Sequence, residues 1–505
     1  MSLILLIWLA VYPLVGAVSW SSTDTRLTGP PADDYAPAIA QTVDERIWVF
    51  WHKLYISGAE DIFYTTYDGG TWSPETLFIG GSNNDITPAP LVARDGTFWL
   101  FWASNTMGFN NYRILCKTST DNGLSWSAPE TLTNPSLNTT YSDREPSVIQ
   151  AADGRIWVLW YSQRSGNMDL FYKIYDGQSW SEDAQLTFNS SEDKYGSIMQ
   201  AQNGTIFVFW TSLRTGNYEL FYKKSSNNGN SWSSEIELTF VSNLADNLSF
   251  ATKTRDGTIW VFWQREGGPE DYDVYYKTYS GSTWTDDMMF VGGTTDEIHP
   301  TAFQAANKTF WVAWSSTKAS DTDHDIWFRT TLPYAHDVGV ASIVASPTNV
   351  YRELGTHVKI QVTVRNYGLN AESFTLILYY NSTPIGVQTV TNLSPNAKAS
   401  FNFTWYPTSL PYGHYVLNAY TSTVPGETDT TDNTFNGDTV TLTMIGDVNG
   451  DGIVDMRDVS KLNVYWYDPP VIGILGYFYA ADMNQDGKVN LFDSAMLNLN
   501  WGKTW

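Results

Sequence analysis

Two acidic loops near the C-terminus carry oxygen-bearing side chains at matching positions of a twelve-residue frame. The frames begin at Asp447 and Asp482, and each has a glycine, Gly452 or Gly487, at its sixth position. Ca²⁺ takes roughly six to eight hard oxygen ligands, and glycine at position 6 permits the sharp turn of the loop. The sequence therefore predicts two calcium ions. The predicted ligands, with a backbone carbonyl at position 7, are Asp447, Asn449, Asp451, Ile453, Asp455 and Asp458 in the first loop and Asp482, Asn484, Asp486, Lys488, Asn490 and Asp493 in the second.

A second set of acids recurs at constant spacing along the first two-thirds of the chain. Each acid stands 17 residues before a tryptophan, and the pairs are Asp34 with Trp51, Asp85 with Trp102, Asp143 with Trp160, Asp193 with Trp210, Asp246 with Trp263 and Glu297 with Trp314. Arg164, Arg214 and Arg265 follow three of these tryptophans closely. The acids and arginines are candidates for binding a ligand, but repetition in every unit favours a structural role, with acids that cap turns and arginines that form ion pairs. No cluster of nucleophile, base and orienting group is visible around them.

The elements that position these residues are six copies of one unit. The apolar runs RIWVFW, TFWLFW, RIWVLW, TIFVFW, TIWVFW and TFWVAW end at the six tryptophans. Each unit has the pattern of four short strands, and its tryptophan run is apolar on both faces, as expected of a strand between neighbouring sheets. Four-stranded units of about 50 residues are typical of a β-propeller. The sequence therefore predicts a mainly β protein that begins with a six-bladed propeller over residues 20–333.

The sixth unit stops after DIWFRTT, before a fourth strand. The segment SWSSTDTRLT, from Ser19 to Thr28, has the pattern of that missing strand, with Trp20 in the place of Trp72 or Trp180. Pairing of this segment with the last unit would close the ring and leave no open sheet edge.

The turn between the third and fourth strands of the second unit reads STDNGLSW, and the fourth unit has SSNNGNSW at the same place. The first, third and fifth units keep the shorter forms YDGGTW, YDGQSW and YSGSTW. These turns resemble the Asp-box of sialidase-like BNR-repeat propellers, in which an Asx side chain closes on backbone amides. Sialidases also use an arginine triad whose first member lies in an Arg-Ile-Pro segment. That segment does not occur here, so the resemblance implies the fold without the activity.

Strand order decides which residues share a face of the predicted propeller. The repeated acids start the first strands, on the same face as the tips between second and third strands, and the Asp-box turns lie on the opposite face. A second set of acids starts the third strands: Asp61, Asp169, Glu219, Asp273 and Asp325. If the acids are functional, they rim a polar pocket at the axis of the ring that takes a cation or a polyhydroxylated ligand.

Tryptophan almost disappears after residue 335, and alternating runs separated by glycine, proline and asparagine follow. In HVKIQVTVRNYG, Val358, Ile360, Val362 and Val364 fall on one face of a strand, with polar residues on the other. This pattern predicts an antiparallel β-sandwich. Residues 336–444 resemble a CARDB domain, an immunoglobulin-like module, through DVGVASIVASP, VRNYG and the late ETDTTDN. The resemblance implies spacing or adhesion rather than catalysis.

The two calcium loops are each followed by a duplicated helical segment, LNVYW and LNLNW. With aspartate rather than glutamate at position 12, residues 446–505 resemble a type I dockerin, a small α-helical calcium-binding domain. This resemblance implies Ca²⁺-dependent docking onto a cohesin-bearing protein. Residues at loop positions 10 and 11 are the expected partner contacts, namely Met456, Arg457, Leu491 and Phe492.

Composition limits the remaining possibilities. The formal net charge of −24 argues against nucleic acid and anionic membranes as partners. The apolar start predicts a signal peptide over residues 1–19, with a retained membrane anchor as the alternative because no Lys or Arg precedes the run. Eight Asn-X-Ser/Thr triplets permit glycosylation of an exported chain. With Cys116 as the one cysteine, the chain forms no internal disulfide.

These observations predict a secreted or cell-surface protein with three domains: propeller, sandwich and dockerin. The favoured function is non-catalytic, with a propeller that binds a glycan or a protein and a dockerin that attaches it to a cohesin. A carbohydrate-active enzyme, such as a sialidase-like glycoside hydrolase of polysaccharide degradation, is the main alternative, and a purely structural protein of the cell envelope is a third. A pair of carboxylates at the separation of a glycosidase site would favour the enzyme.

Overall fold

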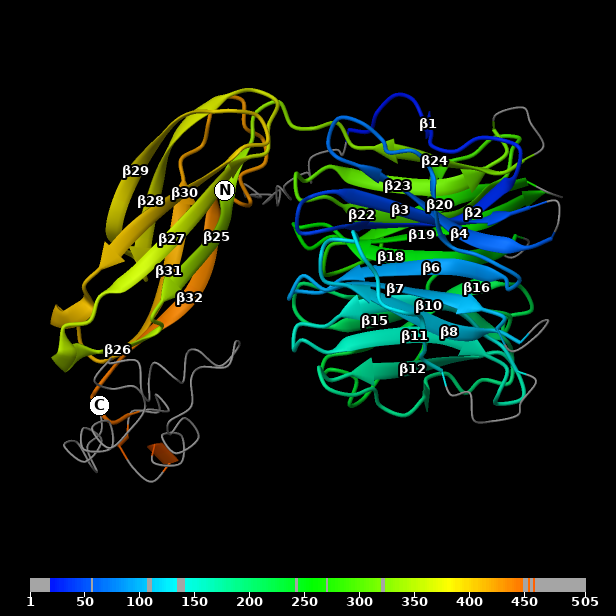
Figure 1. Ribbon diagram of the computed structural model, residues 1–505, viewed down its shortest axis with the longest axis horizontal. Helices are drawn as coiled ribbons and strands as arrows, with labels where there is room; N and C mark the ends of the chain where they lie inside the picture. Colours follow the sequence, from blue (N-terminus) through cyan, green and yellow to red (C-terminus); the bar gives the residue numbers. More distant parts are fainter. Residues whose placement is uncertain are drawn as a thin grey trace, which may run out of the picture. The chain divides into compact units, whose positions relative to one another are not determined.

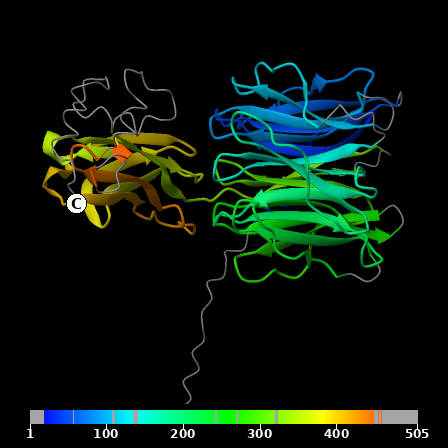
Figure 2. The same cartoon turned by 90° about the horizontal axis from the view of Figure 1, so that it is seen from below.

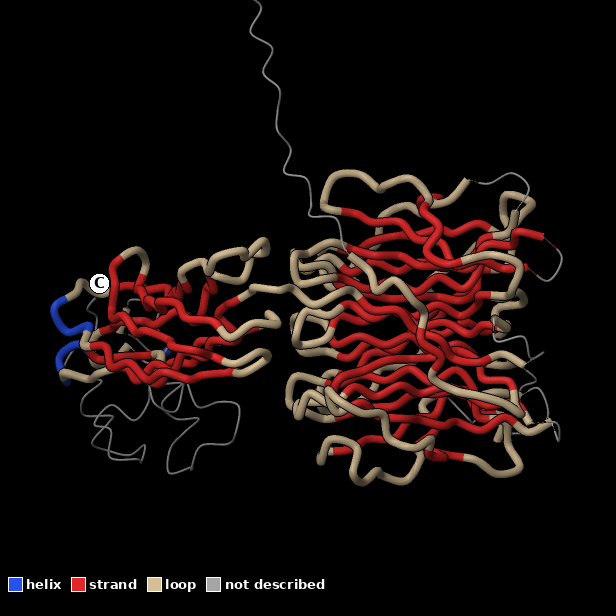
Figure 3. Tube along the Cα trace, turned by 90° about the horizontal axis from the view of Figure 1, so that it is seen from above, coloured by secondary structure: helices blue, strands red, loops and turns tan. Residues whose placement is uncertain are grey.

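The computed structural model describes residues 19–55, 58–106, 111–133, 141–240, 244–268, 271–318, 323–447, 453–454 and 457–458. These residues are almost entirely β-structure and turns (Figure 3). They fall into two compact units, one that ends at Leu332 and one that begins at Pro333. No helix among them is long and apolar enough to cross a membrane.

Between residues 20 and 331, the described residues form six four-stranded antiparallel sheets (Figure 1). Sheet 1 is β2 (Asp33–Gln41), β3 (Ile47–Leu54), β4 (Glu60–Tyr67) and β5 (Thr76–Ile79), and sheet 2 is β6 (Asp85–Val92), β7 (Phe98–Ser104), β8 (Arg113–Ser119) and β9 (Glu130–Thr131). Sheet 3 is β10 (Asp143–Gln150), β11 (Ile156–Ser162), β12 (Asp169–Tyr175) and β13 (Ala184–Gln185), and sheet 4 is β14 (Asp193–Gln200), β15 (Ile206–Ser212), β16 (Glu219–Ser225) and β17 (Ile236–Glu237). Sheet 5 is β18 (Asp246–Lys253), β19 (Ile259–Gly268), β20 (Asp271–Tyr279) and β21 (Met288–Val291), and sheet 6 is β22 (Glu297–Gln304), β23 (Phe310–Ser316), β24 (Asp325–Thr330) and β1 (Thr25–Arg26).

The six sheets close into the ring of a propeller, and Figure 2 shows their strands side by side from a second direction. Their first strands contact one another in sequence order, and β22 of sheet 6 contacts β2 of sheet 1. A hydrophobic cluster fills the space between each sheet and the next. The six repeated tryptophans are completely buried in these clusters, as expected of second strands that are covered on both faces.

The N-terminal segment completes sheet 6, as the sequence predicted. In β1, Thr25 and Arg26 pair with Phe328 and Trp327 of β24, and Trp20 forms an isolated bridge to Thr331. The equivalent bridges in sheets 1 and 3 join Tyr67 to Trp72 and Tyr175 to Trp180. The ring therefore has no unpaired edge at its seam.

A chain that begins at Gly29 should aggregate or melt at a much lower temperature, because the outer edge of β24 loses its partner. The single change Trp20→Ala should cost about 2 kcal/mol, less than a fully buried aromatic, since Trp20 is only partly buried against Phe290 at 4.9 Å between ring centroids. Thermal melts of both variants beside the parent chain measure these effects. A truncated chain that melts like the parent would show that the ring closes elsewhere.

The Asp-box turn forms as the resemblance implied. Asp121 Oδ1 accepts a hydrogen bond from the Ser125 amide at 2.9 Å, and its Oδ2 accepts from the Ser125 hydroxyl at 2.5 Å. Gly123 has a φ of +86°, and a Cβ there would clash with the neighbouring Trp48 ring. Trp126 packs on Phe78 of sheet 1 with centroids 5.0 Å apart, so the turn also joins two sheets.

The second unit is a sandwich of a three-stranded and a five-stranded sheet. The first sheet is β25 (Val338–Ser346), β27 (Val358–Asn366) and β30 (Lys398–Trp405). The second is β26 (Asn349–Tyr351), β32 (Thr434–Thr443), β31 (Gly413–Thr421), β28 (Glu372–Tyr380) and β29 (Thr383–Leu393), and two 3₁₀ turns lie at Arg352–Leu354 and Pro407–Ser409. The four residues predicted for the core face of β27, Val358, Ile360, Val362 and Val364, are completely buried.

Candidate functional site

The repeated acids lie on the side of the propeller where the second strands turn into the third strands. Each acid is at or beside the start of a first strand. They are at most 4% exposed, and Asp34, Asp143, Asp193 and Asp246 are completely buried. Three indoles donate to them: Trp51 to Asp34 at 2.9 Å, Trp102 to Asp85 at 2.8 Å and Trp263 to Asp246 at 2.9 Å. In these three sheets the spacing of 17 residues thus corresponds to a hydrogen bond between the first strand and the second, whereas the indoles of Trp160, Trp210 and Trp314 form no such bond. Glu297 instead accepts from the hydroxyls of Thr295 and Ser316.

The three candidate arginines each bridge one of these buried acids and a second acid near the outer strand of the same sheet. The bonded pairs are Arg164 with Asp143 (2.5 Å) and Asp183 (2.5 Å), Arg214 with Asp193 (2.8 Å) and Glu235, and Arg265 with Asp246 (2.7 Å) and Asp287 (2.5 Å). In sheet 1, Lys53 takes the same role between Asp34 at 3.6 Å and Glu75 at 2.8 Å. The structure therefore brings the predicted site residues together as ion pairs inside single sheets.

The outer acids were not among the residues singled out in the sequence. Asp183, Glu235, Asp287 and Glu75 each stand three residues after the tryptophan of the turn before the fourth strand, and this constant offset could have revealed them. Third-strand lysines complete the network and reach the preceding sheet. Lys173 Nζ donates to the Leu132 carbonyl at 2.9 Å and lies 3.0 Å from Asp183. The network thus holds neighbouring sheets together.

Arg164→Ala should lower the free energy of unfolding by about 3 kcal/mol, because Asp143 would stay buried without its cation. Arg155→Ala is the matched control, since Arg155 pairs with Asp153 where both are about one-third exposed, and it should cost only about 0.5 kcal/mol. Chemical denaturation of both variants measures the difference. Equal, small losses would show that the Arg164 pair is not structural.

A cavity of about 460 Å³ lies at the centre of the ring, lined by the first strands of all six sheets. Each of these strands has a bulge two residues after its acid, where pairing with the second strand shifts register. The residue at the bulge has a positive φ although none of the six is glycine: Ala36 (50°), Thr87 (53°), Glu145 (53°), Tyr195 (56°), Leu248 (52°) and His299 (54°). A left-handed conformation costs a non-glycine residue roughly 1–3 kcal/mol, and bulges often re-aim side chains at functional sites.

All six bulge residues line the cavity. Since alanine and leucine adopt the same bulge as glutamate, tyrosine and histidine, the backbone feature belongs to the scaffold and the side chain is free to differ. Among the bulge residues, Thr87, Glu145, Tyr195 and His299 bring polar side chains to the cavity, and Arg94 and Lys253 line it as well. Residue types gave no signal for this, because alanine and leucine do not mark a left-handed position in a sequence.

Burial controls the charge of these groups. It raises the pKa of Glu145 to about 7, and the adjacent Arg144 opposes the shift. Burial also lowers the pKa of His299 to about 4, so its imidazole is neutral near pH 7. The Arg144 guanidinium lies 4.0 Å from the ring centroid of Tyr112, and Tyr195 packs edge-on against Tyr161 with centroids 5.5 Å apart. Glu145 and His299 thus offer hydrogen-bonding groups of low charge to the cavity, beside the ring of Tyr195.

Three histidines surround Tyr35 at the seam between sheets 6 and 1. The Tyr35 hydroxyl lies 3.1 Å from His324 Nδ1, and its ring centroid is 5.7 Å from that of His52 and 5.9 Å from that of His299. Burial lowers the pKa of His52 to about 3, and its Nδ1 accepts a hydrogen bond from the Thr87 amide at 3.4 Å. These residues, far apart in the sequence, come together at the seam, and His299 is the member of the group that lines the cavity.

Family models account for most of the chain. A BNR repeat-like domain matches residues 45–312, a CARDB domain matches residues 337–437 and a dockerin type I domain matches residues 445–500. The chain belongs to the BNR repeat-like family. Its three modules therefore agree with the resemblances found in the sequence, and the dockerin implies a cohesin partner. No curated protein is similar enough to match the chain.

Several solved structures are similar to the propeller part of the chain. A protein of unknown function from Dyadobacter fermentans is 15% identical with a TM-score of 0.52, over 61% of this chain and 97% of its own. An α-L-arabinanase of Penicillium chrysogenum, solved with arabinobiose, is 15% identical with a TM-score of 0.48 over the same shares. The NanB sialidase of Streptococcus pneumoniae is 11% identical with a TM-score of 0.48, over 61% of this chain and 70% of its own.

A few of the predicted dockerin residues are described. Asp447 and Asp458 are completely buried, and the Thr443 hydroxyl donates to Asp447 Oδ2 at 2.6 Å. Ile453 and Arg457 are exposed. Buried carboxylates in this frame fit a hard cation such as Ca²⁺. The other predicted ligands and contacts lie outside the described residues: Asn449, Asp451, Asp455, Met456, Asp482, Asn484, Asp486, Lys488, Asn490, Leu491, Phe492 and Asp493.

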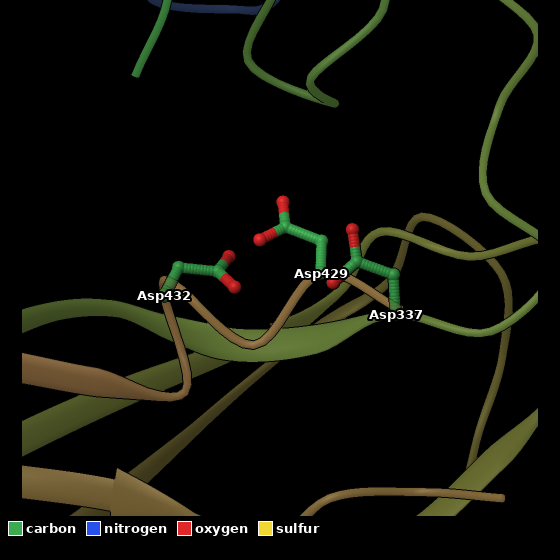
Figure 4. A group of neighbouring side chains, drawn as sticks. All are labelled: Asp337, Asp429 and Asp432. Carbon is green, nitrogen blue, oxygen red and sulfur yellow. The ribbon is translucent and has the colours of Figure 1, made fainter. Parts of the chain in front are cut away.

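Three carboxylates of the CARDB module also come together, at Asp337, Asp429 and Asp432 (Figure 4). One oxygen of each lies within 4.8 Å of the others, which is close enough to hold a hard cation. Gly339 makes room for this arrangement, because a Cβ there would clash with the Asp432 carboxylate. Two of the acids come from the ETDTTDN segment used above to recognise the module. Acidic groups of this kind also occur without a metal, and we assign no ion to this one.

Proposed function

We propose that the protein is an exported, non-catalytic glycan-binding protein, with a six-bladed propeller that binds the glycan in its axial cavity and a helical dockerin that attaches it to a cohesin. The observation that carries the proposal is the set of six left-handed bulges, which place Glu145, Tyr195 and His299 along one cavity. In this proposal residues 1–19 form the signal peptide, the sandwich at 336–444 is a spacer and residues 446–505 form the dockerin.

The chemistry of the cavity supports a polyhydroxylated, uncharged ligand. Sugar hydroxyls both donate and accept hydrogen bonds, and the cavity offers a carboxyl, a phenol and a neutral imidazole beside apolar surface. Ligand sites of this kind are mostly apolar with a few placed polar groups. Arg164, Arg214 and Arg265 are held in ion pairs. Of the two cationic side chains that line the cavity, Arg94 donates to the Ala152 carbonyl, and burial lowers the pKa of Lys253. This arrangement favours a neutral glycan over sialic acid.

A glycoside hydrolase is the second candidate, and one observation favours it. A carboxyl with a pKa near 7 can protonate a leaving group at neutral pH, and Glu145 has this property. Hydrolysis also needs a second carboxylate about 5 to 9.5 Å away. The other bulge positions carry no carboxylate, so the ring of bulges supplies one acid rather than a pair.

Glu145→Gln separates the two functions. Glutamine keeps the hydrogen-bonding capacity of the protonated carboxyl but cannot transfer a proton, so binding should stay within about threefold at pH 7. The affinity of the parent chain should fall as pH rises through about 7, since deprotonation removes the donor, while the glutamine variant should show no such dependence. A panel of arabinan, xylan, galactan and mannan oligosaccharides, tested for binding and for release of reducing ends, measures both effects.

Release of reducing ends by the parent chain that Glu145→Gln abolishes would establish the hydrolase instead. Glu145→Ala serves as the control for the lost side chain and should weaken binding by about tenfold, because it removes the donor and leaves a gap.

Two calcium ions, one per loop, are proposed to hold the dockerin in its docking conformation. Each loop gathers carboxylates whose mutual repulsion a bound cation relieves, so metal binding contributes to folding. Arg457 is exposed beside the buried Asp458, which supports its proposed place in the cohesin contact. Met456, Leu491 and Phe492 complete the proposed contact.

Changing Asp447 and Asp482 together to alanine should abolish Ca²⁺-dependent retention by cohesin, and a chelator should have the same effect on the parent chain. Pull-down against a panel of cohesins with and without calcium measures docking, and calorimetric titration should count two sites in the parent chain. The melting of the propeller should not change, which controls for general unfolding. Docking that persists in chelator would contradict the proposal.

A further inference from the structure

Two phenylalanines are almost fully exposed at equivalent positions of neighbouring sheets. Phe188 follows β13 of sheet 3 and is 74% exposed, and Phe240 follows β17 of sheet 4 and is 73% exposed. Large apolar side chains at the surface of a soluble protein often mark an interaction site. The repetition allows a test of whether the fold itself needs these rings.

The residue before each phenylalanine is an anchored threonine. Thr187 Oγ accepts from the Leu170 amide at 2.9 Å, and Thr239 Oγ accepts in the same way from the Leu220 amide at 3.0 Å. Thr28 and Thr133 form this bond in sheets 6 and 2. The residues that follow the four threonines are Gly29, Asn134, Phe188 and Phe240. Because glycine and asparagine stand at the same position of the repeated sequence, the repeat does not require an aromatic residue there.

Both phenylalanines lie on the face where the first strands begin, which is also the face of the bulges that open into the cavity. The connections that carry them are held by the tips of their sheets. Asn167 Nδ2 donates to the carbonyls of Asn189 at 2.8 Å and Ser191 at 2.9 Å, and Asn217 bonds the Leu244 carbonyl in the same way one sheet later. The tip of sheet 4 adds Leu213, which is 38% exposed and whose amide donates to the Glu192 carbonyl. Phe188, Leu213 and Phe240, here called the apolar patch, thus lie on the face of the propeller where the first strands begin.

We propose that this patch is a platform for the sugar rings of an uncharged polysaccharide chain whose end or branch enters the axial cavity. The proposal rests on the proposed glycan-binding function and specifies its ligand as a polymer. Aromatic rings present flat apolar surface to the C–H face of a sugar, and they lose little conformational entropy when they bind. The net charge of −24 on the protein disfavours binding of an anionic polymer, so the polysaccharide that we expect on the patch is neutral.

The test is the double variant Phe188→Ala with Phe240→Ala in the full chain. Affinity electrophoresis in arabinan, xylan, galactan and mannan, and titration with the di- and trisaccharides of each, compare long with short ligands. The double variant should bind the preferred polymer at least about tenfold more weakly, with short-saccharide affinity and melting temperature unchanged. Leu124→Ala is the control, because Leu124 is 78% exposed in the Asp-box turn of the opposite face, and it should change neither.

Each other outcome overturns the inference. Unchanged polymer affinity in the double variant, or a parent chain that binds polymer no more tightly than trisaccharide, removes the platform but leaves the cavity as a glycan site. A parent chain that prefers polygalacturonate to the neutral polymers removes the uncharged ligand. A parent chain that binds neither polymers nor short saccharides removes the platform and the proposed function together.

Discussion

The structure depends on a buried carboxylate at the start of each first strand. It accepts a hydrogen bond from the indole of the second strand in sheets 1, 2 and 5, and a cation from the same sheet neutralises it in sheets 1, 3, 4 and 5. Breaking a pair of this kind leaves a charge in a dry interior, which is strongly destabilising. The acid therefore fixes the alignment of the first strand along the second. Because this alignment is the same in each sheet, the bulge two residues after the acid lies at the central cavity in all six.

This arrangement separates the parts of the propeller that hold it together from the parts that can specify a ligand. The acids and tryptophans recur in all six sheets and the paired cations in four of them, as expected of residues that hold the scaffold together. The bulge residues and the positions after the anchored threonines differ from sheet to sheet although their backbones are the same. Positions where the backbone is the same in every sheet but the residue type differs are therefore the candidates for function. Positions where the residue type itself repeats belong to the scaffold.

Much of the fold could be predicted from periodic residues. The tryptophan runs predicted the second strands, and the segment around Trp20 predicted the closing strand. The alternation from Val358 to Val364 predicted a core strand of the sandwich. A pocket at the axis of the ring was predicted, but the residues that line it could not be predicted in the same way, and the repeated acids expected at its rim are not among them. Its bulges are left-handed at Ala36 and Leu248, where residue type gives no warning, and contacts such as that of Lys173 with Leu132 join residues 41 positions apart. The sequence drew attention to Arg164, Arg214 and Arg265, which are chemically conspicuous, but the structure places them in ion pairs inside the sheets.

The central claim is that the side chains held by the bulges bind a neutral glycan in the axial cavity. A crystal structure of the chain with its tightest-binding neutral oligosaccharide tests this most directly. The account predicts a sugar residue inside the ring, with hydroxyl groups in hydrogen-bonding distance of Glu145, Tyr195 and His299. A sugar bound only at the Asp-box face or on the sandwich, with the cavity filled by water alone, would contradict it.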